Sequence, residues 1–399
     1  MTDRPRPDDE PEGAFAIFVI FLRLGLTAFG GPVAHIGYFR EAFVVRRGWL
    51  SEARYAELVA LCQFLPGPAS SQAGFALGLM RGGWRGALAA FAGFTAPSAI
   101  ALALFAGALG AMGQGGAGWL TGLKAAAAAA VALACWGMAK TLCPDRSRQT
   151  LAVVAAALAA LAPGLAGQLG AVLLGALVGL ALRPAGGGDD GPAALLPVSK
   201  RAGAVALAGF AALLLALPLL AGLGPIWAVA DGMARAGAFV FGGGHVVLPL
   251  LQVEMVDTGL VDRATFLAGY GAAQAVPGPL FTVAAHLGMA AAGVMGALVA
   301  TLAIFAPGFL LLIGVAPFWG AVRGRPAARH ALAGINAAVV GLLLAALWNP
   351  VFTGAAATPV GFALTAAALL AMGAWRLSPA IVVVAAALLG AAAEAAGLI

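Results

Sequence analysis

Two arginines are the charged residues of this sequence whose setting best suits binding of an anion. Arg23 and Arg235 each lie within an apolar segment, six residues before Phe-Gly-Gly. A charged side chain at bilayer depth costs roughly 3 kcal/mol or more, so such residues usually have a function. Arginine stays protonated, and its planar fork of donors fits a tetrahedral oxyanion. Each could instead cap nearby carbonyls or snorkel to an interface, and Arg235 could pair with Asp231 one helical turn earlier.

Two Pro-Gly-Pro motifs offer a second kind of anion site. Proline removes a backbone donor and clashes with the preceding turn, so Pro66-Gly67-Pro68 and Pro277-Gly278-Pro279 must each interrupt a helix. The half-helix that follows presents free amides at a positive dipole end, where anions bind. Ser70 and Ser71 add hydroxyl donors after the first motif, and Thr282 adds one after the second. The alternative is a packing kink whose hydroxyls bond the preceding turn.

Four further polar residues lie at matching places in the two halves of the sequence. Lys124 is on an alanine-rich segment, and Asn336 takes its place 212 positions later. A desolvated lysine can lose its proton and so couple transport to protons, but snorkelling to an interface explains it equally well. Gln63 and Gln274 each precede a Pro-Gly-Pro motif by three residues. They can bond either the interrupted backbone, which we favour, or a ligand.

The elements that must position these residues form an internal repeat. Arg-x-Gly-x-x-x-Phe-Gly-Gly and Gln-x-x-Pro-Gly-Pro each occur twice, at offsets of 212 and 211 positions. Inside a membrane, interrupted backbone survives only where protein or a polar cavity satisfies it. Two interruptions at matching places in two halves therefore point to a transport site. The predicted helix-break residues are Gly30, Gly31, Gln63, Pro66, Pro68, Gly242, Gly243, Gln274, Pro277 and Pro279.

Composition places these elements in a membrane. Of the 399 residues, 62% are hydrophobic and only 10% are charged, with a mean hydropathy of +0.99, whereas a soluble domain carries about 25% charged residues. We predict an all-α polytopic membrane protein of two inverted-topology repeats, with broken or re-entrant helices at Phe-Gly-Gly and Pro-Gly-Pro. The net charge of +6 reflects the positive-inside bias rather than a nucleic-acid partner.

The apolar segments fall into two sets of seven with one unpaired segment between them. Several are nearer 14 residues than the roughly 20 that span hydrocarbon, which suggests half-helices, re-entrant pieces or tilted partners. The first set is 14–29, 33–45, 53–80, 84–111, 119–142, 150–161 and 165–182, and the unpaired segment is 202–223. The second set is 226–241, 246–256, 264–289, 295–318, 331–348, 358–372 and 379–398.

The basic residues predict the orientation of the chain. Most of the 22 lysines and arginines fall on one side if the broken segments return to the side they entered from, and that side is then cytoplasmic. This puts the N-terminus inside and the C-terminus on the periplasmic side. The predicted parts are a cytoplasmic tail (1–13), an N-terminal transporter repeat (14–183), a cytoplasmic insert with an inverting helix (184–225) and a C-terminal inverted repeat (226–399).

No enzyme signature is present, so we expect neither catalysis nor a cofactor. The sequence lacks His-Glu-x-x-His, a P-loop and a nucleotide-binding glycine pattern. The three cysteines, Cys62, Cys135 and Cys143, are an odd set without metal-site spacing, so we expect no bound metal.

Other titratable residues near the helix breaks are expected to have structural roles rather than to bind the substrate or carry protons. We interpret the histidines as hydrogen-bonded core residues and the two glutamates as solvated charges at segment ends. These residues are His35, His245, His286, Glu41 and Glu254.

The motifs resemble those of the chromate ion transporters of bacteria. In the first half the resemblance lies in Phe29-Gly30-Gly31-Pro32, Trp49-Leu50-Ser51 and Leu65-Pro66-Gly67-Pro68. In the second half it lies in Phe241–Leu251 and Gln274–Pro279. The resemblance covers nearly the whole chain and is similar to the long, two-domain form of the family.

This resemblance implies a bacterial inner-membrane permease that exports chromate, driven by the proton-motive force, and so gives chromate resistance. Arg23 and Arg235 resemble the family's basic positions before Phe-Gly-Gly, while Gln72 stands near a place where relatives carry a carboxylate. Two alternatives stay open: a permease for another oxyanion such as sulfate, and a membrane-embedded enzyme acting on a lipid-linked phosphate. The sequence is also compatible with a homodimer.

Overall fold

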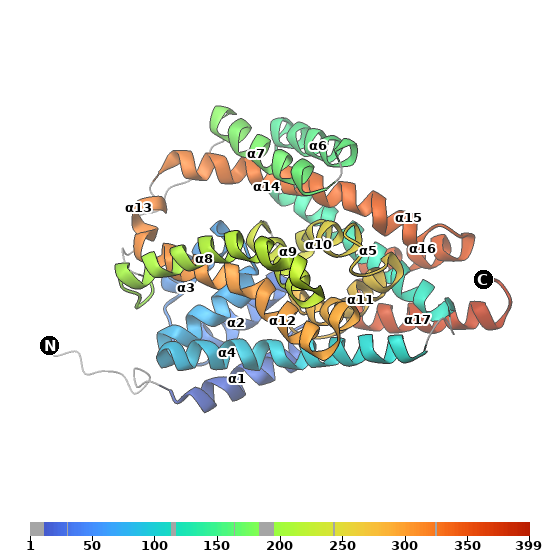
Figure 1. Cartoon of the computed structure of the whole chain (residues 1–399), viewed down its shortest axis with the longest axis horizontal. Coiled ribbons are helices and arrows are strands. Elements are labelled where there is room, and N and C mark those ends of the chain that lie inside the picture. The colour runs from blue at the N-terminus through green and yellow to red at the C-terminus, as the bar shows by residue number, and fades with distance from the viewer. Residues whose placement is uncertain are drawn as a thin grey trace.

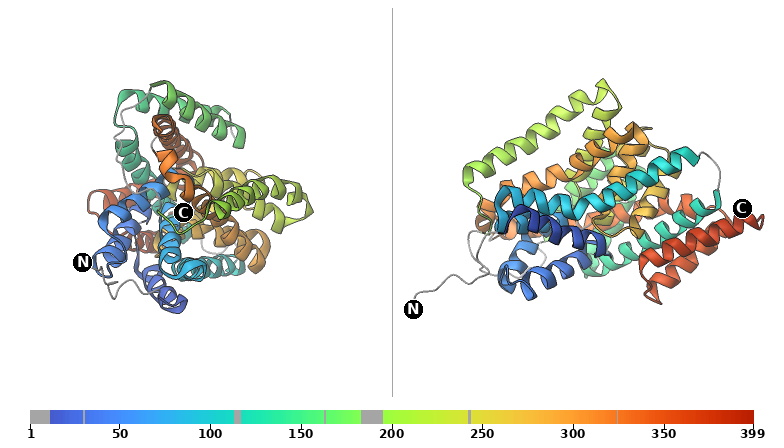
Figure 2. Two further views of the ribbon diagram at one scale, coloured as in Figure 1. Left: turned by 90° about the vertical axis from the view of Figure 1, so that its left-hand side faces the viewer. Right: turned by 90° about the horizontal axis from the view of Figure 1, so that it is seen from below.

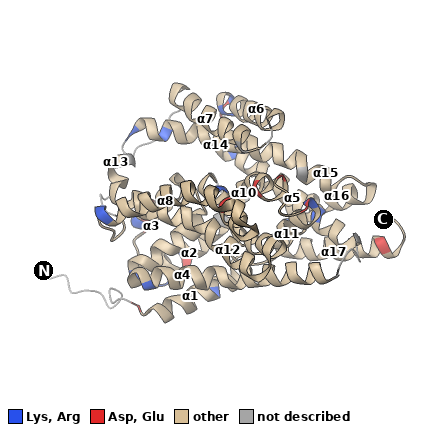
Figure 3. Ribbon diagram, viewed as in Figure 1, with Lys and Arg blue, Asp and Glu red and all other residues tan. Residues whose placement is uncertain are grey.

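The computed structural model describes residues 12–29, 31–112, 117–162, 164–182, 195–241, 244–323 and 325–399. Within these ranges the chain is helical without strands, which confirms the all-α prediction (Figure 1). Charged residues are sparse along the helices (Figure 3). Among the described residues, five helices are long and apolar enough to cross a membrane, in agreement with a polytopic membrane protein. They cover Ala69–Ala111, Gly118–Leu142, Lys200–Leu223, Leu280–Ala321 and Pro326–Ala355.

The helices follow the order of the predicted segments. The first half contains α1 (Ala14–Thr27), α2 (Gly31–Phe39) with the π-helical η2 (Arg40–Val45), α3 (Glu52–Phe64), α4 (Ala69–Met112), α5 (Ala117–Leu142), α6 (Arg146–Leu161) and α7 (Leu165–Leu182). The unpaired helix is α8 (Lys200–Leu220), which continues into η3 (Ala221–Leu223).

The second half runs through elements of similar order. These are α9 (Pro225–Ala238), η4 (Gly244–Val246), α10 (Val247–Leu251) with the π-helical η5 (Gln252–Val256), α11 (Arg263–Ala275), η6 (Leu280–Thr282), α12 (Val283–Val315), η7 (Ala316–Phe318), α13 (Trp319–Arg323), α14 (Pro326–Ala346), η8 (Leu347–Phe352), α15 (Thr353–Ala355), α16 (Pro359–Gly373) and α17 (Pro379–Ala395).

Glycines break α4 and α12 at matching places. The sequence predicts a gap between segments 53–80 and 84–111, and the backbone of α4 is non-helical there, at Gly82 and Gly83, where Gly83 has φ 59°. The two parts of α4 fold back on each other, since a Cβ on Gly78 would overlap the Gly86 carbonyl oxygen. In α12 the kink lies at Ala292 and Gly293, and Gly293 has φ 66°. Because glycine adopts positive φ without a steric penalty, the chain can bend there without a loop.

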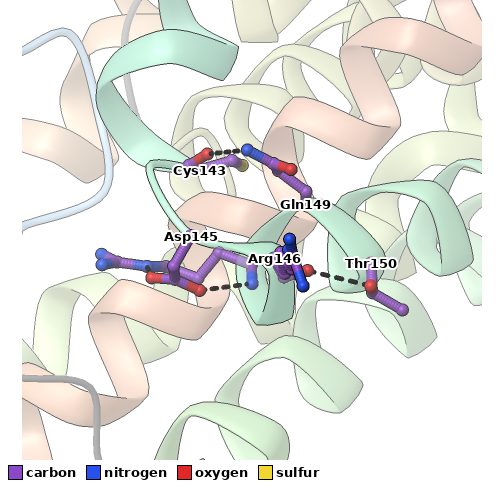
Figure 4. Close-up of polar contacts among 6 residues, drawn as sticks. Cys143, Asp145, Arg146, Gln149 and Thr150 are labelled. Carbon is purple, nitrogen blue, oxygen red and sulfur yellow. Dashed lines mark hydrogen bonds and ion pairs between the residues drawn. The ribbon is translucent and has the colours of Figure 1, made fainter.

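Helix α6 begins four residues before the segment predicted from hydropathy, at Arg146 rather than residue 150. The Asp145 carboxylate accepts a hydrogen bond from the Arg148 amide at 2.9 Å (Figure 4). The Gln149 side chain donates to the Cys143 carbonyl at 3.2 Å, and the Thr150 hydroxyl donates to the Arg146 carbonyl at 2.9 Å. A side-chain cap satisfies free amides of the first turn, so the helix includes polar residues that apolar periodicity omits.

The two halves are interlaced. Helix α5 packs against α16 and α17 of the second half, and α14 packs against α6 and α7 of the first half (Figures 1 and 2). Within each half, α1 packs on α4 and α9 packs on α12, while α4 and α12 contact each other. The structure therefore brings the proline-broken segments of both halves together at its centre.

Small residues allow the interlaced helices to approach closely. A Cβ added at Gly122 of α5 would overlap the carbonyl oxygen of Ala386 on α17. At the matching place on α14, a Cβ at Gly334 would overlap the carbonyl of Gly175 on α7. Close approach at small residues is the usual basis of helix association inside a membrane, where hydrophobic burial gives no net gain.

Candidate functional site

Each Pro-Gly-Pro loop is hydrogen-bonded to the broken segment of the other half. The Gly67 amide donates to the Val240 carbonyl at 2.8 Å, and the Gly278 amide donates to the Ala28 carbonyl at 2.9 Å. Both glycines have positive φ, 122° and 102° respectively. Helix α3 ends at Phe64 and α11 at Ala275, so these contacts satisfy backbone that the prolines removed from a helix.

The hydroxyls after the first Pro-Gly-Pro motif lie in a buried polar region. Ser70 and Ser71 are 3% and 4% exposed in the first turn of α4. The Ser70 hydroxyl lies 3.4 Å from His35 Nδ1, and His35 Nε2 lies 3.2 Å from the Ala28 carbonyl. The buried Ser71 Oγ has no hydrogen-bond partner among the described residues. This first turn therefore holds a free buried hydroxyl beside the shared backbone contact.

Thr282, after the second motif, and Gln72, after the first, both bond backbone. Thr282 is 1% exposed and its hydroxyl donates to the Pro279 carbonyl at 2.7 Å. Gln72, which is fully buried, donates to the Pro66 carbonyl at 3.1 Å and to the Gly308 carbonyl at 2.9 Å. Gln72 thus connects the first Pro-Gly-Pro loop to α12 of the other half.

Arg235 lies in a buried charge cluster with two carboxylates. Its guanidinium is 2.9 Å from Asp231 Oδ2, and it donates to both Glu254 oxygens at 3.0 and 2.6 Å. The side chains of Asp231 and Glu254 are only 5% and 3% exposed. The pairing with Asp231 was the alternative considered from the sequence. The interpretation of Glu254 as a solvated charge is wrong, because η5 turns this carboxylate towards α9.

Arg23 has a different environment. It is exposed on α1, and only its carbonyl is engaged, by the Thr27 hydroxyl at 2.7 Å. No carboxylate pairs with its guanidinium among the described residues. The two arginines at matching positions in the sequence therefore differ: Arg235 is neutralised by carboxylates and Arg23 is not.

The remaining predicted residues are separated. Lys124 is half-buried on α5 and interacts electrostatically with Asp262. Asn336 on α14 has a buried Oδ1 without a described hydrogen-bond partner. Gln63 is exposed, whereas Gln274 is partly buried. Gly30, Gly242 and Gly243 lie outside the described residues, as does the side chain of His245.

A cavity of about 380 Å³ lies between the two halves. Gly31, the first residue of α2, lines it together with Gln274 and Gly278 of the second half and with Arg376 from the loop between α16 and α17. The rest of the lining is apolar and comes from α5, α11, η6, α16, α17 and two adjoining loops: Ala130, Leu133, Ala134, Ala273, Val276, Leu280, Met372, Leu377 and Pro379. Three predicted helix-break or binding residues are thus brought together, and Arg376 joins them.

The sequence did not identify Arg376, which was one more basic residue near a segment end. Its backbone has φ 55°, the one positive φ of a non-glycine residue in the described part of the chain. A left-handed backbone costs an ordinary residue roughly 1–2 kcal/mol. The Leu377 amide donates to the Ala371 carbonyl across this turn at 3.0 Å, a helix ending at which glycine is usual. Hydropathy carries no signal for such a conformation.

The comparisons agree with the resemblance seen in the motifs. The family described as "Chromate transporter" matches residues 15–180 and 227–391, once in each half of the chain. The chromate transport protein of Pseudomonas aeruginosa is 29% identical over 408 residues, covering 97% of this chain and 93% of the relative. A probable chromate transport protein of Synechococcus elongatus is also 29% identical, over 82% of both chains. The chromate transport protein of Cupriavidus metallidurans is 27% identical, over 83% of this chain and 81% of the relative.

No solved structure matches the chain significantly. The relatives indicate a transporter rather than an enzyme, and the five apolar helices agree with a multi-pass membrane protein. Since the family match covers most of both halves, this chain belongs to the chromate transporter family.

Proposed function

We propose that this protein exports chromate from the cytoplasm across the bacterial inner membrane, driven by the proton-motive force, and so confers chromate resistance. Family membership supports chromate as the transported anion. The observation that carries the transport mechanism is the reciprocal pair of bonds from Gly67 to Val240 and from Gly278 to Ala28. Each interrupted helix is completed by the other half, so a relative movement of the halves would change both breaks at once.

In this proposal the halves are inverted with respect to the membrane and rock about a site between them. The N-terminus is cytoplasmic and the C-terminus periplasmic, as the basic residues suggest. Arg23, which has no carboxylate partner among the described residues, is free to attract chromate. The first turn of α4, after the first Pro-Gly-Pro motif, supplies amide donors and the Ser71 hydroxyl to the passing anion.

Arg235 acts as the gating residue in this mechanism. Its guanidinium is already paired with Asp231 and Glu254, so a dianion can use the whole donor fork only after a carboxylate leaves. A proton on Glu254 would remove one of the two negative charges and release the guanidinium fork. Proton binding at this cluster would then be coupled to anion binding, because protonation of Glu254 frees the guanidinium that the anion needs.

Chromate uptake by everted membrane vesicles tests this function. Vesicles energised with a respiratory substrate should accumulate chromate, and an uncoupler should abolish the accumulation. Uptake that ignores the uncoupler would contradict proton-driven export. Uptake no greater than in vesicles without the protein, with the protein shown to be present, would overturn the chromate assignment. Competition by sulfate would reveal a broader oxyanion permease.

A further inference from the structure

The cavity between the halves has the features of an oxyanion pocket. Of the described residues that line it, Arg376 alone is charged, and none is a carboxylate. Its volume of about 380 Å³ corresponds to roughly a dozen water molecules at ~30 Å³ each, enough for a tetraoxyanion with part of its hydration shell. A cavity that combines one cation with apolar walls favours a bound anion over a neutral solute.

Arg376 is available for a ligand. No ion pair or hydrogen bond engages its guanidinium among the described residues. Its neighbours in sequence end α16 through backbone bonds, with the Trp375 amide donating to Leu370 at 3.2 Å and the Leu377 amide to Ala371 at 3.0 Å. Glycine would serve this turn with less strain. An arginine held in a strained backbone beside a cavity indicates that its side chain has a use there.

Two further residues that line the cavity carry backbone or side-chain donors. Gln274 lines the cavity beside the buried Tyr270 hydroxyl, and its Nε2 has no hydrogen-bond partner of ordinary geometry among the described residues. An unsatisfied buried donor is costly, so a ligand acceptor would relieve it. Gly31 also lines the cavity and begins α2, whose N-terminus carries partial positive charge. The lining thus includes an arginine, a glutamine and the first residue of a helix, contributed by both halves.

We propose that this cavity binds a tetrahedral dianionic oxyanion through Arg376 and Gln274, with the N-terminus of α2 as a third contact. The inference rests on the proposed function, because it names where the transported anion is held. It also gives Gln274 a ligand role in place of the backbone role favoured from the sequence. Because Gly278 lines the cavity and bonds Ala28, an anion there touches the contact that joins the two halves.

Equilibrium binding of labelled chromate to the full-length protein in phosphatidylcholine nanodiscs tests the pocket. Arg376→Gly should weaken binding roughly 10- to 100-fold, the range expected when a charge-assisted hydrogen bond is lost. Its melting temperature should stay equal or rise, since glycine accepts the left-handed backbone. Gln274→Met, which keeps the volume and removes the donor, should weaken binding roughly 10-fold. Arg201→Gln, an exposed arginine on α8 outside the cavity, is the control and should bind as the wild type does.

The outcomes separate this inference from the proposed function. If Arg376→Gly and Gln274→Met both bind chromate as the wild type does and still transport it, the cavity is not the binding site, but the proposed function is unaffected. Binding of sulfate or molybdate that depends on Arg376, without binding of chromate, would uphold the pocket and remove chromate as the substrate. The proposed oxyanion site would be wrong if the wild-type protein bound no free oxyanion. It would also be wrong if phosphatidylglycerol, but not sulfate, displaced the bound anion, because the cavity would then be a site for a lipid headgroup.

Discussion

The Gly67 amide of the first half donates a hydrogen bond to the Val240 carbonyl of the second half at 2.8 Å. The Gly278 amide repeats this bond towards Ala28 at 2.9 Å, 211 positions further along the sequence. An interrupted helix normally leaves backbone groups without partners, at a cost of several kcal/mol each in a membrane. Here the two interruptions satisfy each other, so neither half has a complete backbone without its partner.

Replacement of Gly67 by alanine should destabilise the protein. Its φ of 122° is outside the regions open to other residues, and a Cβ would lie 3.0 Å from the Gly308 Cα. Gly48→Ala is the control, because Gly48 has φ 62° but open space around it. We expect a loss of roughly 1–2 kcal/mol for Gly48→Ala and a larger loss for Gly67→Ala, measured as melting temperature in detergent. Equal losses would show that the contact with α12 is unimportant.

Arg235→Gln should reduce the stability of the protein as well as transport. The substitution leaves two buried carboxylates facing each other, and removal of one partner of a buried ion pair typically costs roughly 3–5 kcal/mol. A second change, Glu254→Gln, should restore part of the melting temperature by removing one unpaired charge. Arg23→Gln should leave the melting temperature unchanged, since no carboxylate depends on Arg23. A stable Arg235→Gln protein would contradict the role of this cluster in the fold.

Glu254→Gln should make chromate uptake by everted vesicles insensitive to the uncoupler. The substitution mimics a permanently protonated carboxylate, so anion binding at Arg235 no longer depends on the binding of a proton. Glu41→Gln is the matched control, because Glu41 lies on η2 and forms an exposed pair with Arg46. Uptake by that variant should still collapse with the uncoupler. If Glu254→Gln behaves as the control does, protons are coupled elsewhere.

Gly122→Val should disturb the contact between α5 and α17. The added side chain would meet the Ala386 backbone, and close helix packing in a membrane depends on such small residues. Gly137→Val is the control on the same helix, since a Cβ at Gly137 meets nothing within 4 Å. We expect a lower melting temperature for Gly122→Val alone. An equal change in both variants would point to an effect on helix α5 itself.

The cap at Asp145 should contribute stability that depends on pH. Hydrogen bonds from the backbone and side chain of Arg148 lower the pKa of Asp145 from its ordinary value of 3.8. A carboxyl group whose pKa is lower in the folded state stabilises fully above the ordinary pKa, and the effect is lost as pH falls through the folded pKa. Asp145→Ala should therefore lower the melting temperature by a constant amount from pH 7 to pH 5, and the difference should shrink below about pH 4. A difference that grows on acidification would contradict this cause.

Periodicity and proline chemistry were sufficient to predict the helical class, the order of the segments and the places where helices are interrupted. They could not predict long-range electrostatics. Asp231 is one helical turn from Arg235, so it could be predicted as an ion-pair partner. Glu254 is 19 positions away and reaches the arginine only because η5 turns inward. The role proposed for Arg376 depends on its backbone dihedral and on a cavity that several elements share. Neither can be predicted from a local sequence pattern.

The interlaced packing constrains how the chain can be synthesised and completed. When the ribosome has finished α7, the Gly122 face of α5 and the Gly175 face of α7 are formed but have no helix to contact, because α14 and α17 are not yet made. The first half must therefore remain an open intermediate in the membrane for the time needed to add more than two hundred residues. Quality control that removes unfinished membrane proteins would act in this interval. A chain truncated after α8 would leave a fragment whose helix-contact surfaces on α5 and α7 stay exposed.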